Sequence, residues 1–328
     1  MGLWLDFALL AVNARLYPGT REGKSWGAGH PPQENNTNIM IVAYDIGGTR
    51  IRAARVAGAE VMPLGEVPTP TTDFPAFIAA IGRFAEGAGG IALSVAGIVD
   101  PASQRLKVAN IPCADGRALG PELEAALGLP VKVLNDADCF ALAEAHHGAG
   151  RGHRNVFGII LGTGVGGGLV IDGRVVQGAG GFAGEWGHGP VLSGHLALPC
   201  GCGQVGCLDT IGGARGIERL HRLLGQGAAS SEEIVDGWRR GDPVASATVS
   251  VWIERMAGPL AMVLNVVGAS AVPAGGGLSR AVDLVAALDA AVRTRVLRPT
   301  AEALVRPAEC SGEPGLIGAA AAFRDQNA

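Results

Sequence analysis

The chain has 328 residues, of which 48% are hydrophobic, so it is long enough to form about two domains with sizeable cores. Its 26 Lys and Arg residues against 30 Asp and Glu residues give a net charge of −4, which excludes a broad nucleic-acid-binding surface and a nucleic-acid partner. No stretch of about 18 uninterrupted apolar residues occurs in the sequence, so we expect neither a membrane-spanning helix nor a membrane partner.

The first 39 residues show no pattern of regular structure. A short apolar run at the start is interrupted by Asp6 and has no basic residue before it, which is unlike a secretory signal peptide. Residues 17–39 are rich in Gly, Pro and Asn, and Met40 stands directly before the first strand pattern. We therefore interpret residues 1–39 as a disordered or spurious N-terminal extension before a true start at Met40.

The first half of the chain alternates strand and helix patterns. Apolar runs bounded by glycines predict strands, and apolar residues at helical spacing predict helices. The predicted strands cover residues 39–45, 51–57, 89–97 and 130–136, with another starting near residue 61, and the predicted helices cover residues 74–86, 119–127 and 137–146.

A second block begins near Gly150 and repeats the same design. A strand, a glycine-rich turn and a second strand occupy residues 155–176, roughly 116 residues after the first such unit. Further helices are predicted over residues 214–224, 231–239, 243–267 and 316–324, and a strand with a triple-glycine turn over residues 269–280 enters another helix. Two copies of one unit predict an α/β protein with two related lobes and a ligand cleft between them.

Three glycine-rich turns are candidates for binding a nucleotide, because paired glycines let backbone N–H groups approach phosphates closely. Asp45 in the first turn suits a hydrated Mg²⁺, which prefers oxygen ligands. Ordinary hairpin turns and tight strand–helix packing are the alternatives, and none of the three is a P-loop. The candidates are Asp45, Gly47, Gly48, Thr49 and Arg50, then Gly162, Thr163, Gly164, Gly166 and Gly167, and finally Gly275, Gly276 and Gly277.

Asp136 stands between a predicted strand and a predicted helix. A carboxylate at such a strand end is a candidate general base, and Asn135 beside it offers both a donor and an acceptor for hydroxyl groups. We interpret Asp138 as a helix-start charge that the helix dipole favours. A base together with phosphate-binding loops points to phosphoryl transfer to an alcohol.

Six cysteines in this chain are too few for a secreted disulfide scaffold and favour a cytoplasmic, reducing compartment. Three of them, Cys200, Cys202 and Cys207, lie within eight residues, and His188 lies twelve residues upstream of the first. Three thiolates and one imidazole suit a closed tetrahedral Zn²⁺ site, with His195 as a rival for the imidazole ligand. A short-loop disulfide and a catalytic thiol are the alternatives.

The motifs DIGGTR, LNDADCFALAEA, ILGTGVGGG, GEWGH, CGCGQVGCLD and GGGLS occur in this order and together resemble the ROK family of bacterial repressors, open-reading-frame proteins and sugar kinases. The resemblance implies an α/β fold with two lobes, the actin-like (ribonuclease-H-like) ATPase fold, whose active site lies in the interlobe cleft. It implies an N-terminal lobe of residues 40–149, completed by a C-terminal helix over residues 314–326, and a C-terminal lobe of residues 150–313.

The resemblance also implies an activity, namely ATP-dependent phosphorylation of the 6-hydroxyl of a hexose with Mg²⁺. Residues 110–145 resemble the members that phosphorylate N-acetyl-D-glucosamine most closely. Asp136 is then the general base, and a structural Zn²⁺ is implied. The implied sugar-binding residues are Gly97, Asn110, Asn135, Glu185, His188 and Asp209, and the implied zinc ligands are His188, Cys200, Cys202 and Cys207.

Two residues depart from the family pattern. Asp209 stands where these kinases usually have Glu, which leaves the sugar open, and Arg50 stands where they often have Lys, which keeps the charge though not the geometry. Glucokinase, N-acetylmannosamine kinase and fructokinase activities are the alternatives within the family. A sugar-responsive repressor is disfavoured because residues 1–39 are too short and too rich in Pro and Gly for a winged helix-turn-helix, and a zinc-bearing sugar-binding protein without catalysis is the third possibility. We expect a homodimer.

Overall fold

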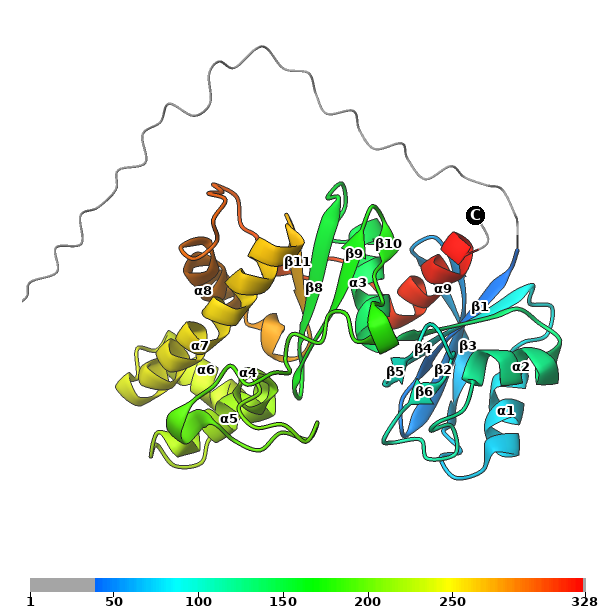
Figure 1. Ribbon diagram of the computed structural model, residues 1–328, viewed down its shortest axis with the longest axis horizontal. Coiled ribbons are helices and arrows are strands. Elements are labelled where there is room, and N and C mark those ends of the chain that lie inside the picture. The colour runs from blue at the N-terminus through cyan, green and yellow to red at the C-terminus, as the bar shows by residue number, and fades with distance from the viewer. Residues whose placement is uncertain (1–38, 327–328) are drawn as a thin grey trace, which may run out of the picture. The chain divides into compact units, whose positions relative to one another are not determined.

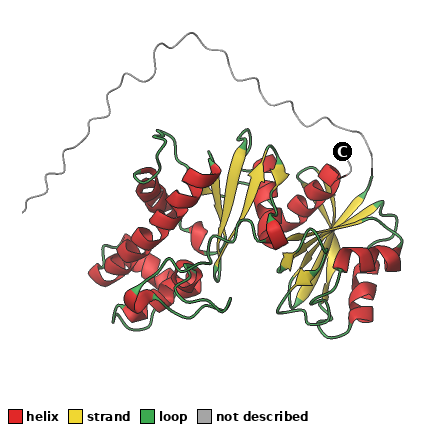
Figure 2. Cartoon of the chain, in the orientation of Figure 1, coloured by secondary structure: helices red, strands yellow, loops and turns green. Residues whose placement is uncertain are grey.

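The computed structural model describes residues 39–326, which form two five-stranded sheets with helices against them (Figures 1 and 2). Residues 1–38 lie outside the described range, so the interpretation of residues 1–39 as an extension stays a prediction. Among the described helices, none combines the length and the apolarity that crossing a membrane requires, and this includes the longest, of 25 residues.

The two sheets have the same strand order, which confirms the repeat seen in the sequence. In each sheet a three-stranded antiparallel meander is extended by two strands parallel to its first strand. The first sheet has the order β3-β2-β1-β4-β7, with β1 Ile41–Ile46, β2 Arg50–Ala57, β3 Glu60–Pro68, β4 Gly90–Val95 and β7 Val131–Asn135. The second has the order β10-β9-β8-β11-β12, with β8 Asn155–Leu161, β9 Val165–Ile171, β10 Arg174–Val175, β11 Val272–Gly275 and β12 Val305–Pro307.

Nine α-helices are found in the described residues, and a small hairpin of β5 (Ile98–Val99) and β6 (Leu106–Lys107) accompanies the first sheet. Most helix boundaries match the sequence patterns to within two residues. The helices are α1 Phe74–Gly82, α2 Leu119–Leu127, α3 Asp136–His147, α4 Asp209–Gly212, α5 Ala214–Leu223, α6 Ser231–Arg239, α7 Pro243–Val267, α8 Val282–Arg293 and α9 Pro314–Gln326.

Two sequence predictions about helices need correction. The helix predicted over residues 74–86 ends at Gly82, because the next residues form tighter turns in which the Phe84 and Ala85 N–H groups bond to carbonyls three residues back. The triple-glycine turn enters a short 3₁₀ helix, Leu278–Arg280, and α8 starts only at Val282.

Helices α3 and α9 pack against each other between the two sheets (Figure 1). Helix α9 contacts β1, β4 and β7 of the first sheet, and α3 contacts β8 and β9 of the second. The helices cross so closely at Gly318 that a Cβ atom there would lie 1.8 Å from the Cys139 carbonyl oxygen. Buried alanines of α9 fill the same layer, which explains the alanine-rich sequence of this helix.

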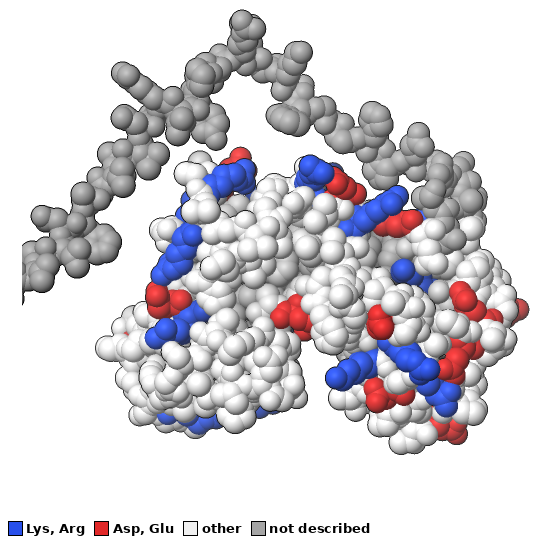
Figure 3. Space-filling view, in the orientation of Figure 1, with Lys and Arg blue, Asp and Glu red and all other residues white. Residues whose placement is uncertain are grey.

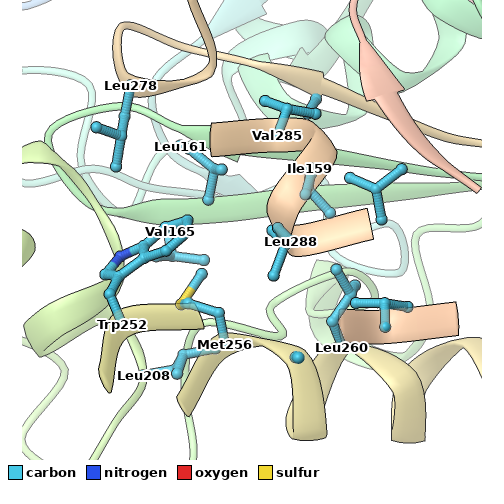
Figure 4. Close-up of a cluster of buried hydrophobic side chains, with 14 of the residues drawn as sticks. Ile159, Leu161, Val165, Leu208, Trp252, Met256, Leu260, Leu278, Val285 and Leu288 are labelled. Carbon is cyan, nitrogen blue, oxygen red and sulfur yellow. The ribbon is translucent and has the colours of Figure 1, made fainter. Parts of the chain in front are cut away.

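Two further cores cover the outer faces of the sheets. Helices α1 and α2 close the first sheet around Tyr44, Phe77 and Leu93. On the second sheet, Ile159, Leu161 and Val165 meet Trp252 and Met256 of α7 and Leu288 of α8, as Figure 4 shows. The central strands β1, β4, β8 and β11 are thus buried on both faces, whereas the edge strand β3 has no buried residue.

We expect Gly318→Ala to lower the free energy of unfolding by about 1–3 kcal/mol or more, because the added methyl group overpacks the crossing of α3 and α9. Urea denaturation monitored by circular dichroism measures this. Gly258→Ala on the exposed face of α7 is the control, because a Cβ atom at Gly258 meets nothing within 4 Å and Ala favours helix, so this change should not lower stability. A Gly318→Ala protein as stable as the wild type would contradict the packing described here.

Candidate active site

The start of α3 carries the residue that sequence patterns predict to be the base. Strand β7 ends at Asn135, whose side-chain oxygen accepts hydrogen bonds from the N–H groups of Ala137 (2.8 Å) and Asp138 (3.3 Å). The side-chain nitrogen of Asn135 donates to the Gly97 carbonyl at 2.9 Å. Asn135 therefore caps the helix and joins it to a second predicted sugar-binding residue, so Asp136 is held as the first residue of α3.

Asp136 remains accessible to solvent, yet the protein around it changes its ionisation. Desolvation, with smaller contributions from the negative charges of Asp45 and Glu185, raises its pKa to about 6, although the N–H of Ala137 opposes the shift. A carboxylate with this pKa is ionised at neutral pH and is more basic than an ordinary Asp, which is what a general base needs.

The first glycine loop joins β1 to β2 beside this helix. The Gly47 N–H bonds to the Arg50 carbonyl at 3.0 Å, and the Thr69 hydroxyl donates to the Gly47 carbonyl at 2.7 Å. A Cβ atom at Gly48 would lie 3.0 Å from the side chain of Asn110, so the loop packs directly on a predicted sugar-binding residue. The guanidinium of Arg50 forms an exposed ion pair with Glu66 at 2.6 Å.

Arg52 is a charged residue of this region that the sequence patterns did not single out. It pairs across the hairpin with Asp45, lies 3.9 Å from that carboxylate, and bonds to both oxygens of Glu313 at 2.9 and 3.0 Å. Desolvation raises the pKa of Asp45, Arg52 lowers it and Glu313 raises it again. The sequence could have pointed to Arg52 through the predicted hairpin, because residues directly opposite each other on paired strands share one face of a sheet.

The second glycine loop, at residues 162–167, lies where β8 turns into β9, and the triple-glycine turn packs against it. A Cβ atom at Gly276 would lie 2.5 Å from the Leu161 carbonyl carbon, so this glycine serves close packing. Gly277, by contrast, has nothing within 4 Å of its Cβ position and is open to a ligand. Gly167 packs on Trp186, whose indole N–H donates to the Gly166 carbonyl at 2.8 Å.

The indole contact of Trp186 fixes the loop that contains Glu185 and His188. The Nε2 atom of His188 lies 3.7 Å from a carboxylate oxygen of Glu185, and its Nδ1 atom lies 3.6 Å from the Cys200 sulfur. Burial raises the pKa of Glu185, while His188 lowers it. One nitrogen of the imidazole ring thus lies near a predicted sugar-binding carboxylate, and the other lies near the cysteine cluster.

The predicted metal ligands come together in space. One ligand atom from each of His188, Cys200, Cys202 and Cys207 lies within 4.8 Å of the others, and the sulfurs of Cys202 and Cys207 are 3.6 Å apart. Tetrahedral Zn²⁺ with its usual bond lengths separates two sulfurs by about 3.8 Å and a sulfur from a nitrogen by about 3.5 Å. The donor set and its spacing therefore fit zinc. His195 is not part of this cluster of described residues.

Asp209 begins α4 immediately after the cysteine cluster. One of its carboxylate oxygens accepts the N–H of Val165 at 2.7 Å, and the other lies 3.8 Å from the Cys200 sulfur. Its assignment to the sugar stays a prediction.

The structure corrects the interpretation of Asp138 as a charge favoured by the helix dipole. It does lie in the first turn of α3, but its side chain is buried, and desolvation together with Glu185 and Asp136 raises its pKa to about 8. The acid is therefore mostly protonated at neutral pH. Burial outweighs the helix dipole here because the penalty for desolvating a carboxylate is the larger effect.

The candidate residues gather from both sheets. Asp45 and Glu185 affect the ionisation of Asp136, and Asp209 affects that of Glu185, so four carboxylates are electrostatically linked. The face drawn in Figure 3 is hollowed, and acidic atoms lie at the edge of the hollow. Glycine loops beside clustered carboxylates suit a cation-assisted reaction on a phosphate ester or anhydride.

Comparisons with known sequences all point to one protein family. The sequence profile of the ROK family matches residues 41–326. An N-acetyl-D-glucosamine kinase of Pasteurella multocida is 35% identical over 301 residues, which cover 87% of this chain and 99% of that protein.

Solved structures agree. A ROK hexokinase of Thermus thermophilus superposes with a TM-score of 0.77 at 30% identity, covering 88% of this chain and 99% of the other. A ROK family glucokinase of Streptomyces griseus, solved with glucose and AMPPNP, has a TM-score of 0.68 at 29% identity and covers 88% and 100%.

We expect Asp138→Asn to become progressively more stable than the wild type as pH rises from about 4 to 8. The folded-state pKa of Asp138 lies above its unfolded value of about 3.9, so its contribution to stability is complete at low pH and is lost as the pH approaches 8. Asn keeps the shape and removes the ionisation. Urea unfolding at pH 5, 6.5 and 8 measures the difference, and a difference independent of pH would disprove the assignment.

Proposed function

The chain belongs to the ROK family and is an ATP-dependent sugar kinase, and from this premise we propose that it phosphorylates the 6-hydroxyl of N-acetyl-D-glucosamine. The observation that carries the proposal is the position of Asp136 at the start of α3, capped by Asn135 and electrostatically linked to Asp45 and Glu185. The similarity to N-acetyl-D-glucosamine kinases over most of both chains supports the choice of sugar.

We assign the proton transfer to Asp136. Its carboxylate takes the proton of the sugar 6-hydroxyl as that oxygen bonds to the γ-phosphorus of ATP, and the bond to the bridging oxygen breaks to release ADP. We propose that the backbone N–H groups of residues 48–49 and 163–164 bind the phosphates, because those of Gly47 and Gly162 are already bonded within their own loops, and we assign Gly277 to the adenosine side. Asp45 would hold Mg²⁺ through water, and the ion would neutralise charge on the phosphates.

The sugar contacts follow from the side chains that surround Asp136. Asn110 lies against Gly48, while Asn135 bonds to the carbonyl of Gly97. Glu185 and His188 approach from the second sheet and supply a carboxylate and an imidazole for hydroxyl groups. We propose that these residues orient the 6-hydroxyl toward Asp136.

Glucose is the second candidate substrate, because the two solved relatives are a hexokinase and a glucokinase. An acetamide and a hydroxyl differ at one carbon of the sugar, and pocket shape decides between them.

We also propose a cytoplasmic homodimer. Sugar phosphorylation by ATP and six unpaired thiols fit a reducing cell interior. Met262 and Val266 on α7 are 65% and 77% exposed, and Leu297 beyond α8 is 86% exposed, so apolar surface is available for a second copy. Light scattering of the purified chain tests the dimer.

We expect the acid side of the pH profile of kcat/KM to fall tenfold per pH unit below about pH 6, because a protonated Asp136 cannot accept the hydroxyl proton. Asp136→Asn should lower kcat by at least about 100-fold. Asp283→Asn, a carboxylate in the first turn of α8, is the control and should leave kcat near the wild-type value.

A coupled assay of ADP release with N-acetylglucosamine, glucose, N-acetylmannosamine and fructose measures both expectations and ranks the sugars. Turnover of Asp136→Asn close to wild type would refute the base assignment. Release of ADP with none of the four sugars would refute the proposed function itself.

We propose that the His188 and cysteine cluster binds one structural Zn²⁺ per chain. The metal would hold the loop that carries His188 against the start of α4 and take no part in the chemistry. Elemental analysis should find about one zinc per chain, and Cys207→Ser should lose it and lower the melting temperature. Cys113→Ser, which changes a cysteine outside the cluster, is the control. A zinc-free wild-type chain with unchanged stability would contradict the proposal.

A further inference from the structure

The carboxylate of Asp209 is engaged by the second glycine loop. Its Oδ1 atom accepts the N–H of Val165 at 2.7 Å, which is the residue where the loop returns into β9. Gly164, one residue earlier, has no room for a side chain, because its Cβ atom would lie 2.2 Å from the same oxygen. Because Gly164 has no side chain, the Asp209 carboxylate has room to lie against the loop and accept the Val165 N–H.

The backbone around Asp209 is fixed independently of this contact. Its own N–H donates to the Gly187 carbonyl at 2.8 Å, which ties the start of α4 to the loop of His188. The next helix also approaches the glycine loop, because the Ala214 N–H donates to the Gly162 carbonyl at 2.7 Å. A Cβ atom at Gly213 would lie 2.6 Å from the Thr163 and Gly164 carbonyl oxygens.

Residues 162–165 are thus held on one side by α4 and the start of α5, and Asp209 supplies the charged contact. A hydrogen bond to a charged acceptor is stronger than a neutral one and orients the peptide that donates it. Orientation of one peptide restricts its neighbours in a short loop, since each peptide unit is planar and each residue has only two soft dihedral angles. The N–H groups left for a ligand are then oriented before the ligand arrives, which lowers the entropy cost of binding.

We propose that Asp209 is a positioning residue that fixes the second glycine loop for the phosphates of the nucleotide, and that its main effect is on nucleotide affinity rather than on the sugar. The inference rests on the proposed kinase function. In this structure the aspartate carboxylate reaches the Val165 N–H directly.

Binding of Mg²⁺-AMPPNP in the absence of sugar, measured by isothermal titration calorimetry, tests the inference separately from catalysis. Asp209→Ala should raise the AMPPNP dissociation constant about tenfold to a hundredfold, because a charge-assisted hydrogen bond is lost. Asp209→Asn keeps an acceptor oxygen in place and should restore affinity to within about threefold of wild type. In steady state, Asp209→Ala should raise the KM for ATP far more than the KM for the sugar.

Asp242→Ala is the matched control. Asp242 also accepts a backbone N–H, that of Ala245 at 2.8 Å, but it does so at the start of α7 and outside the glycine loop. Its substitution should lower stability and leave AMPPNP binding unchanged. Zinc content and melting temperature of Asp209→Ala, compared with the wild type, separate a local loop effect from loss of the whole region.

Three results would overturn the inference. Wild-type AMPPNP affinity in Asp209→Ala together with a raised KM for the sugar would make Asp209 a sugar ligand. Equal losses in Asp209→Asn and Asp209→Ala would show that the acceptor oxygen is not what matters. A wild-type chain that binds no AMPPNP would refute both the proposed function and this inference. A wild-type chain that binds AMPPNP but phosphorylates no sugar would refute the proposed function alone.

Discussion

The start of α3 is the constraint on which the site depends. Asn135 satisfies two backbone N–H groups that no earlier turn of helix can reach, and its amide nitrogen binds the carbonyl of Gly97. With the helix start fixed, Asp136 has one available position, at the end of a parallel strand. The rest of α3 then runs between the two sheets, where Cys139 lies against Gly318 of α9.

The electrostatics of the site follow from crowding several carboxylates around that helix. Asp45 and Glu185 raise the pKa of Asp136, while Arg52 is the cation that lowers the pKa of Asp45. Glu185 and Asp136 in turn raise the pKa of Asp138. Hydrogen bonding separates the two acids further. Desolvation raises both pKa values, but backbone N–H groups stabilise the charge of Asp136 and hold its pKa at about 6, whereas only raising effects act on Asp138, whose pKa is about 8. Two acids in one helical turn therefore differ in charge at neutral pH, although the sequence alone makes them look alike.

The cysteine cluster and the second glycine loop belong to one continuous structure. His188 contacts both Glu185 and Cys200, and Asp209 reaches from the residues after the cluster to the N–H of Val165. Groups that would bind the sugar and groups that would bind phosphate are thus supported by the same short stretch of chain. Trp186 adds a further contact by bonding to the Gly166 carbonyl.

The sequence by itself determined the α/β fold class, the repeated hairpin and most helix boundaries, because these depend on local periodicity and glycine turns. The roles of the sugar-binding residues were implied by the resemblance to the ROK family and stay predictions. Helix α7 begins and ends at the predicted residues, since Asp242 caps it and Gly268 terminates it in a left-handed conformation. Only the tertiary structure decided what surrounds each side chain. The proximity of Arg52 and Glu313, the protonated state of Asp138 and the bond from Val165 to Asp209 join segments far apart in sequence or depend on burial, and desolvation and long-range contact leave no local pattern to detect.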